Sequence, residues 1–400
     1  MARYISDRLN LDDLASSRPA LQLFDRHGAM SQSEAAKRLS LSAGACNLHF
    51  QRLEHEGLIR QVELIREKRG RPRQVWNIAG STNYCVLFVF DVPYFQASLI
   101  NFHGEVVANR REDLSATQKP EAVQRKVEAF LQEAQQLVGR GKIRQVLVAA
   151  PGLMDDAGTI VSAVNFPVLN GLDLGALVRD QFSLPCFTTP LGLAYYYGET
   201  ENLPTTASAM VIHWDLGVGV VFGRGRDVYS LELPSHASHR LIWEIGHVRV
   251  VKDGRPCHCG RRGCLEAHTG GWVLMEALNG RHAERLSDLV RAVEQDEAEA
   301  VRLTREAAGL LGQHLSWPLQ LMNSERILVT GPMAPAFKKV RDSFEKGLGK
   351  LFTAPEIAGF GVEASPDPAG RLQRGAYLLA RRVYMYPDDY RTLPRTAAKV

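Results

Sequence analysis

The chain has 400 residues, 45% of them hydrophobic, which suffices for two or three domains with well-buried cores. No apolar run in the sequence approaches the roughly 18 to 20 residues of a membrane-spanning helix, and the charged start, residues 1–13, does not resemble a signal peptide. We therefore expect a cytoplasmic protein with no membrane insertion.

The net charge of +4 is located at one end of the chain. Residues 1–80 carry thirteen Lys and Arg against nine Asp and Glu, whereas the remaining residues are balanced. A local excess of positive charge is typical of a domain with an anionic partner, although four charges also fit ordinary surface variation.

Two short capped helices are predicted near the N-terminus. In "SQSEAAKRL", Ser31 and Glu34 form a capping-box pattern that begins a helix. Ser42 is placed to cap a second helix, whose buried face repeats through Cys46, Phe50 and Leu53. Two such helices with a tight turn between them indicate a helix-turn-helix, whose second helix would enter a DNA major groove.

A basic hairpin is predicted directly after these helices. "LIRQVELI" and "QVWNI" are short β-type runs, and the segment "REKRGRPR" between them has a tip that contains Gly and Pro. The pattern resembles the wing of a winged helix-turn-helix, and arginines on a thin hairpin suit a narrow minor groove. A solvated basic hairpin is the alternative interpretation.

The candidate DNA-binding residues divide into two groups. On the second helix they lie opposite the buried face, where Asn47 and Gln51 have the amide geometry that pairs with adenine. Arg52 and the wing arginines could equally hold phosphates, which sets affinity rather than sequence preference. The full predicted set is Ala43, Asn47, Gln51, Arg52, Lys68, Arg69, Arg71 and Arg73.

From Tyr84 onward the sequence is typical of an α/β protein. Strand-like segments such as "YCVLFVFDV" and "IRQVLVAAPG" alternate with helical ones such as "PEAVQRKVEAFLQEAQQLV". About 300 residues of this kind predict two lobes with a cleft between them.

The segment from Glu244 to His268 contains the most specific motif. "EIGHVRV" and "CHCGRRGCLEAH" give the spacing H-x9-C-x-C-x4-C. The motif closely resembles the signature of the ROK family (repressors, open reading frames, kinases). The resemblance covers about residues 84–385 and implies an actin-like (ribonuclease H-like) two-lobed sugar-kinase fold.

The resemblance also implies the domain organisation. The ROK domain would comprise lobe one at about 84–190, lobe two at about 191–370 and a C-terminal helix at about 371–385. The family's transcriptional regulators add an N-terminal winged helix-turn-helix, which matches residues 1–80 here.

The resemblance identifies His247, Cys257, Cys259 and Cys264 as zinc ligands. Three thiolates and one imidazole would complete a tetrahedral shell without room for water, so the expected zinc is structural. His258 is the alternative fourth ligand, although it lies between two ligands in a short loop. Three reduced cysteines without a metal are the other alternative.

The resemblance further implies an effector site beside the zinc. In the family the ligand histidine and two glutamates face the sugar, and here these are His247, Glu244 and Glu266. Gly152 matches a turn on the opposite wall, although a Pro-Gly turn also has a purely structural explanation.

Four nucleotide or catalytic motifs of the family's kinases are altered in this chain. The first phosphate loop keeps Asp91 but has Pro93, Tyr94 and Phe95 where glycines and threonine are expected. Proline donates no amide, and we expect the two aromatic rings to fill the space of a phosphate. Pro190 and Leu191 replace the Asn and the catalytic Asp, and leucine cannot act as a general base.

The other two motifs are altered in the same way. "LGVGVVFG" keeps Gly217 and Gly219 but has Val218, Val221 and Phe222 in place of threonine and glycines. The nucleoside-side Gly-Gly is replaced by Gly331-Pro332. We therefore expect no enzymatic activity and no ATP as a cofactor.

The sequence thus predicts a DNA-binding transcriptional regulator, and specifically a repressor of sugar-metabolism genes that binds an inverted-repeat operator as a homodimer or tetramer. A sugar or sugar phosphate would be the effector. The helical patterns at about 270–316 would pair subunits or pack within one subunit. A regulator controlled by contact with another protein is the alternative function, and an active sugar kinase is a third.

Overall fold

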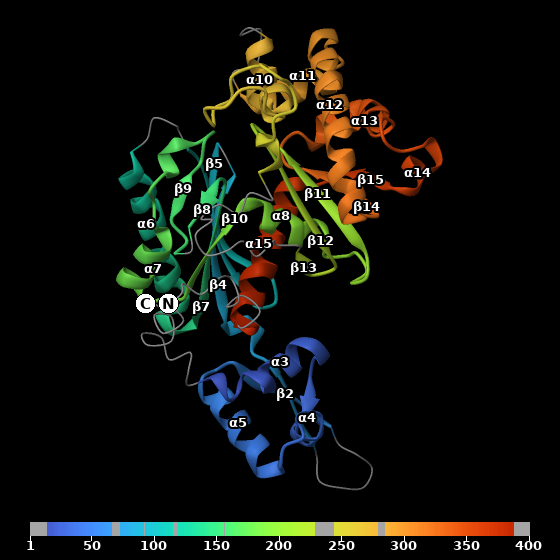
Figure 1. The fold of residues 1–400 in the computed structure, drawn as a ribbon. Coiled ribbons are helices and arrows are strands. Elements are labelled where there is room, and N and C mark those ends of the chain that lie inside the picture. Colours follow the sequence, from blue (N-terminus) through green and yellow to red (C-terminus); the bar gives the residue numbers. More distant parts are fainter. Residues whose placement is uncertain are drawn as a thin grey trace, which may run out of the picture.

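A computed structural model describes residues 14–65, 73–91, 93–114, 119–155, 157–228, 244–278 and 285–387. Figure 1 shows an N-terminal domain below two larger lobes. Within the described ranges, every helix is too short or too polar to span a lipid bilayer.

The N-terminal domain is a winged helix-turn-helix. The hydroxyl oxygens of Ser31 and Ser42 accept hydrogen bonds from the amides of Glu34 (3.3 Å) and Ala45 (3.2 Å), as predicted for the two caps. An additional helix precedes them and ends at Gly28, where φ is +74°. The elements are α3 (Arg18–His27), β1 (Met30–Ser31), α4 (Gln32–Leu39), α5 (Ala43–His55), β2 (Ile59–Ile65) and β3 (Arg73–Ile78), with strand order β1-β3-β2.

Lobe one is built on a mixed sheet with strand order β10-β7-β4-β5-β6. β4 and β5 form an antiparallel hairpin in which Asp91 is opposite Tyr94, whereas β7 runs parallel to β4 and to β10. A short turn, η1 (Gly80–Thr82), connects the lobe to the N-terminal domain. Its other elements are β4 (Tyr84–Asp91), β5 (Tyr94–Asn101), β6 (Val106–Asp113), α6 (Pro120–Val138), η2 (Arg140–Lys142), β7 (Ile143–Ala150), β8 (Leu153–Met154), β9 (Ile160–Ser162), η3 (Pro167–Leu169), α7 (Leu174–Phe182) and β10 (Cys186–Pro190).

Lobe two has a second mixed sheet, with strand order β13-β12-β11-β14-β15. Its elements are α8 (Leu191–Glu199), β11 (Ser208–Trp214), β12 (Val218–Arg224), β13 (Asp227–Val228), η5 (Ile245–His247), α9 (Glu266–Thr269), α10 (Gly271–Ala277), α11 (Leu286–Glu294), α12 (Ala298–Met322), β14 (Arg326–Thr330), α13 (Ala334–Leu348), α14 (Ala354–Gly359) and β15 (Gly361–Ala364). The apolar stripe of α12, including Ala308, Leu311 and Leu315, is buried in this lobe's own core. Packing within the subunit therefore accounts for the stripe.

The C-terminal helix α15 (Pro368–Met385) begins three residues before the predicted boundary and packs against α8. The two helices approach at backbone distance, because a Cβ atom at Gly375 would overlap the carbonyl oxygen of Ala194. A Cβ at Gly198 would likewise overlap the carbonyl oxygen of Arg371. In Figure 1, α15 descends between the lobes toward the N-terminal domain.

The N-terminal domain is docked on the end of α15. Gln22 Nε2 donates a hydrogen bond to the carbonyl oxygen of Met385 (2.9 Å), and Arg18 donates to that of Tyr384. Asp25 forms an ion pair with Arg381 (2.6 Å). Phe24 belongs to the same buried apolar cluster as the C-terminal half of α15. The domain and lobe one therefore share one continuous core.

Candidate metal cluster, cleft cavity and DNA-facing helix

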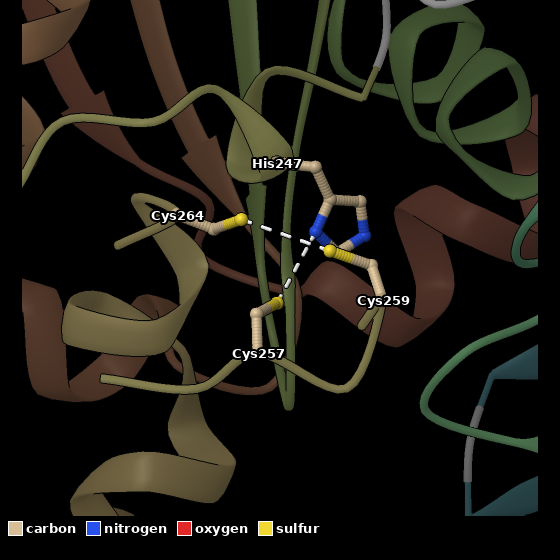
Figure 2. A group of neighbouring side chains, drawn as sticks. All are labelled: His247, Cys257, Cys259 and Cys264. Atoms are coloured by element: carbon tan, nitrogen blue, oxygen red, sulfur yellow. Dashed lines mark hydrogen bonds between the residues drawn. The ribbon is translucent and has the colours of Figure 1, made fainter. Parts of the chain in front are cut away.

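The four predicted zinc ligands converge in lobe two. His247 is the last residue of η5, Cys257 and Cys259 belong to the loop that follows, and Cys264 lies just before α9. Their ligand atoms all lie within 4.8 Å of one another, and Figure 2 shows the four side chains pointing toward a common centre.

The spacing of these atoms fits a tetrahedral zinc ion. The sulfur atoms of Cys259 and Cys264 are 3.7 Å apart, and Cys257 Sγ is 3.5 Å from His247 Nδ1. Zn–S bonds of about 2.3 Å and a Zn–N bond of about 2.0 Å predict edges of roughly 3.8 and 3.5 Å for a tetrahedron. The donor set and its dimensions therefore suit zinc.

The charges in the cluster also favour a cation. Burial raises the pKa of the Cys257 and Cys264 thiols. Burial also acts to raise the pKa of Cys259, but hydrogen bonds with Arg261 and Cys257 together outweigh it and lower the pKa to about 7. Three adjacent thiols resist joint ionisation unless a cation compensates their charge. Arg261 stabilises the thiolate form of Cys259 in particular.

His258, the alternative fourth ligand, has other partners. Its ring stacks on Trp272 with 4.1 Å between ring centroids. Its Nδ1 lies 2.8 Å from the side-chain oxygen of Asn165. These contacts leave His247 as the histidine that faces the three thiols.

The predicted effector residues line one cavity of about 260 Å³ between the lobes, which we call the cleft cavity. Glu244, His247 and Glu266 lie on the lobe-two side, and Gly152 lies on the lobe-one side. His247 Nδ1 faces the thiols while its Nε2 is 3.5 Å from a carboxylate oxygen of Glu244. One imidazole thus joins the cluster to the cavity. At Gly152, φ is +96° and a Cβ would overlap the carbonyl oxygen of Ser162, so the turn itself requires glycine.

Sequence reasoning missed the cavity residues Asn165, His213 and Asp215. Asn165 Nδ2 donates to Glu266 Oε1 (3.0 Å), and His213 Nε2 is 3.0 Å from Asp215 Oδ2. His213 and Asp215 lie at the end of the buried strand β11, and polar residues that directly follow an apolar strand in the sequence indicate a cleft. Asn165 lies in an irregular loop, where the sequence gives no such signal.

The structure corrects the expectation for Phe95. Strand pairing places Phe95 opposite Phe90, and its ring is buried in lobe one, 5.2 Å from that of Phe90. Tyr94 lies beneath Arg111, with 3.9 Å between the guanidinium carbon and the ring centroid. The Phe95 ring therefore points into the core and does not fill a phosphate space, whereas the expectation for Tyr94 stays a prediction.

Asp91 instead contacts a buried tyrosine of α8. The hydroxyl of Tyr195 donates to Asp91 Oδ1 (3.1 Å), and the Tyr195 ring stacks on His213 with 5.3 Å between centroids. Together with the pair of His213 and Asp215, these contacts connect the end of β4, the central strand of the lobe-one sheet, to the end of β11 in the lobe-two sheet. We call this set of four residues the interlobe polar chain.

The second predicted phosphate loop has its amides engaged by carboxylates. The amide of Gly217 donates to Asp215 Oδ1 (2.6 Å), and that of Val218 donates to Glu266 Oε2 (3.3 Å). Pro190 and Leu191 line the cleft cavity where α8 begins. These positions provide no carboxylate to accept a hydroxyl proton.

The predicted base-contacting residues lie along α5. Ala43, Asn47 and Gln51 are exposed, and Arg52 is half-buried. Asn47 Oδ1 accepts a hydrogen bond from Gln32 Nε2 of α4 (3.0 Å). Lys68, Arg69 and Arg71 lie outside the described residues, and Arg73 opens strand β3.

Comparison with known proteins finds matches to both the N-terminal domain and the two-lobed domain. The model of the ROK family matches residues 92–382, and a winged helix-turn-helix DNA-binding model matches residues 20–60. The N-acetylglucosamine repressor of Escherichia coli O6:H1 is 23% identical over 354 residues, which cover 82% of this chain and 83% of that protein. The xylose repressor of Bacillus spizizenii is 19% identical over 355 residues, which cover 86% and 89% respectively.

Two solved structures share the fold. A ROK family transcriptional regulator, described as a homologue of the E. coli Mlc protein, superposes with a TM-score of 0.71 at 18% identity, over 94% of this chain and 99% of that one. A ROK family glucokinase from Streptomyces griseus, in complex with glucose and AMPPNP, superposes with a TM-score of 0.62 at 20% identity, over 75% of this chain and all of that one.

Proposed function

The chain belongs to the ROK family, and from that premise we propose that it is a transcriptional regulator, a repressor of sugar-metabolism genes whose ROK domain senses an effector and does not phosphorylate it. One observation carries the proposal: a winged helix-turn-helix shares a continuous core with a ROK domain through α15. The similar N-acetylglucosamine and xylose repressors support the link to sugar metabolism.

The altered positions oppose kinase activity. Leu191 is buried and apolar, so it cannot remove a proton from a hydroxyl. The amides of Gly217 and Val218 already bind carboxylates, whose negative charge opposes a triphosphate. Asp91 hydrogen-bonds to Tyr195.

Zinc would be held by His247, Cys257, Cys259 and Cys264, and with four protein ligands its role would be structural. His247 would be held in place as a ligand through the nitrogen that faces the thiols, and its Nε2 would stay directed toward Glu244 and the cleft cavity. Glu244 and Glu266 would accept hydrogen bonds from hydroxyl groups of a sugar or sugar phosphate, and Gly152 would form part of the opposite wall.

Regulation would follow the contacts from the cleft cavity to the DNA-binding domain. Pro190 and Leu191 form both the start of α8 and a wall of the cavity. Since α8 and α15 meet at backbone distance, a shift of α8 moves α15, whose end holds the N-terminal domain. In a homodimer on an inverted repeat, such a shift would change the spacing of the two α5 helices.

Calorimetry with a panel of monosaccharides and sugar phosphates tests the effector. Binding of one compound, weakened at least tenfold by Glu266→Gln, would support the proposal. Absence of heat with every compound would favour the alternative, a regulator controlled by contact with another protein. Measured ATP turnover with any hexose would favour the third function, an active sugar kinase.

Selection from a random pool of duplex DNA tests the regulator itself. The wild-type protein should enrich an inverted repeat. A double variant, Asn47→Ala with Gln51→Ala, should lose that enrichment while it keeps its fold, because both side chains are exposed. Equal enrichment by the variant would contradict the assignment of α5.

A further inference from the structure

One exposed apolar side chain lies at the centre of the DNA-facing surface of α5. Leu48 is 66% exposed, and Val62 is the other exposed large apolar residue in the described part of the N-terminal domain. With 3.6 residues per turn, Leu48 lies diametrically opposite the buried face formed by Cys46, Phe50 and Leu53. Asn47 lies on the flank of that exposed surface, about 100° from Leu48 around the helix.

Leu48 also occupies the part of the helix that approaches bases. A recognition helix enters the major groove with its N-terminal residues closest to the base edges, and Leu48 is in the first half of α5. Its neighbour Asn47 already accepts a hydrogen bond from Gln32, so part of its amide is engaged within the protein. In the proposed function, the exposed apolar surface of Leu48 would therefore face the groove.

The major groove offers one apolar group, the C5-methyl of thymine. We propose that Leu48 is a specificity-determining residue that contacts a thymine methyl in each half-site of the operator. This inference rests on the proposed function. Gln51, one turn further along the same surface, would contact a neighbouring base through its amide.

The proposal can be tested by replacing single thymines with uracils in the operator that the wild-type protein selects from a random duplex pool. Uracil lacks only the methyl group. Fluorescence anisotropy should show one position per half-site where the replacement weakens binding roughly fourfold, the contribution of one buried methyl group. Leu48→Ala should bind the thymine and uracil operators equally.

Gln51→Ala is the matched control, because it should weaken binding while it keeps the difference between thymine and uracil. Leu48→Ala is not expected to unfold the domain, since Leu48 is exposed and alanine favours a helix. Sensitivity to uracil that survives in Leu48→Ala, or no sensitive position in the wild type, would overturn this inference alone. A wild-type protein that selects no sequence would overturn the proposed function and this inference with it.

Discussion

The sulfur of Cys259 provides the most direct test of the proposed zinc. We expect about one zinc per chain in the wild-type protein and a large loss of zinc in Cys259→Ser, because three remaining ligands hold the ion more weakly. Loss of a metal site should lower the free energy of unfolding by about 4 kcal/mol or more. Elemental analysis and urea unfolding measure both effects.

Cys186→Ala is the control for that variant, since Cys186 lies in β10 of lobe one and outside the cluster. It should retain zinc. A Cys259→Ser protein with full zinc content would contradict the assignment of the four ligands.

The carboxyl of Asp91 should make the free energy of unfolding depend on pH. Burial, aided by the nearby charge of Asp215, raises the pKa of this carboxyl to about 6, although Tyr195, His213 and Arg111 act in the opposite direction. Because the folded-state pKa lies above the unfolded value of about 3.9, Asp91 stabilises the fold below pH 4, and this contribution is lost as pH rises through 6.

Asparagine at position 91 resembles the protonated carboxyl and keeps an acceptor for Tyr195. Asp91→Asn should therefore be more stable than the wild type at pH 7.5, by up to about 3 kcal/mol, and equally stable near pH 4. Urea unfolding at several pH values measures this difference, in which the other titrating groups largely cancel. A difference that is constant with pH would refute the effect.

At single residues, the sequence predicted the cysteine and histidine cluster well because its ligands are close in the chain and their spacing is specific. The interlobe polar chain was not predicted, since Asp91, Tyr195, His213 and Asp215 come from three separate elements. Phe95 lies in the core because strand alternation in the β4–β5 hairpin directs it to the same face as Phe90, which the loss of the family's glycines did not indicate.

At the scale of elements, local signals predicted α4, α5 and the wing strands, where serine caps and the helical repeat agree. Helix α3 was not among the predicted helices, although Pro19 near its start and Gly28 at its end are residues typical of helix boundaries. The helical periodicity of α12 predicted an apolar face, but it could not show whether that face packs within the subunit or against a second subunit.

The crossing of α8 and α15 depends on glycine. Gly375→Ala should lower the free energy of unfolding by roughly 1 to 3 kcal/mol, because the added methyl group overlaps the backbone of Ala194. Gly359→Ala is the matched control: no atom lies within 4 Å of the added methyl group, so stability should be unchanged or slightly raised. Equal midpoints of urea unfolding for both variants would show that the helices do not approach so closely.

At the scale of the whole molecule, the fold class followed from the family resemblance, and the structure confirms it: the α/β, two-lobed ROK domain matches known ROK structures. The docking of the N-terminal domain could not be predicted. It uses the side chains of Gln22 and Asp25 against the end of α15, more than 350 residues away in the chain. These contacts join the DNA-binding domain directly to the ROK domain, and in the proposed function they would carry a change at the cleft cavity to the DNA.

Genomic footprinting of the bound protein tests the central claim, that this chain is a sequence-specific regulator of sugar genes. The account predicts discrete sites that contain inverted repeats, with half-site centres about 10 base pairs apart or a whole multiple of that distance, next to genes for sugar uptake or breakdown. A footprint no different from that of a strain without the protein would contradict it.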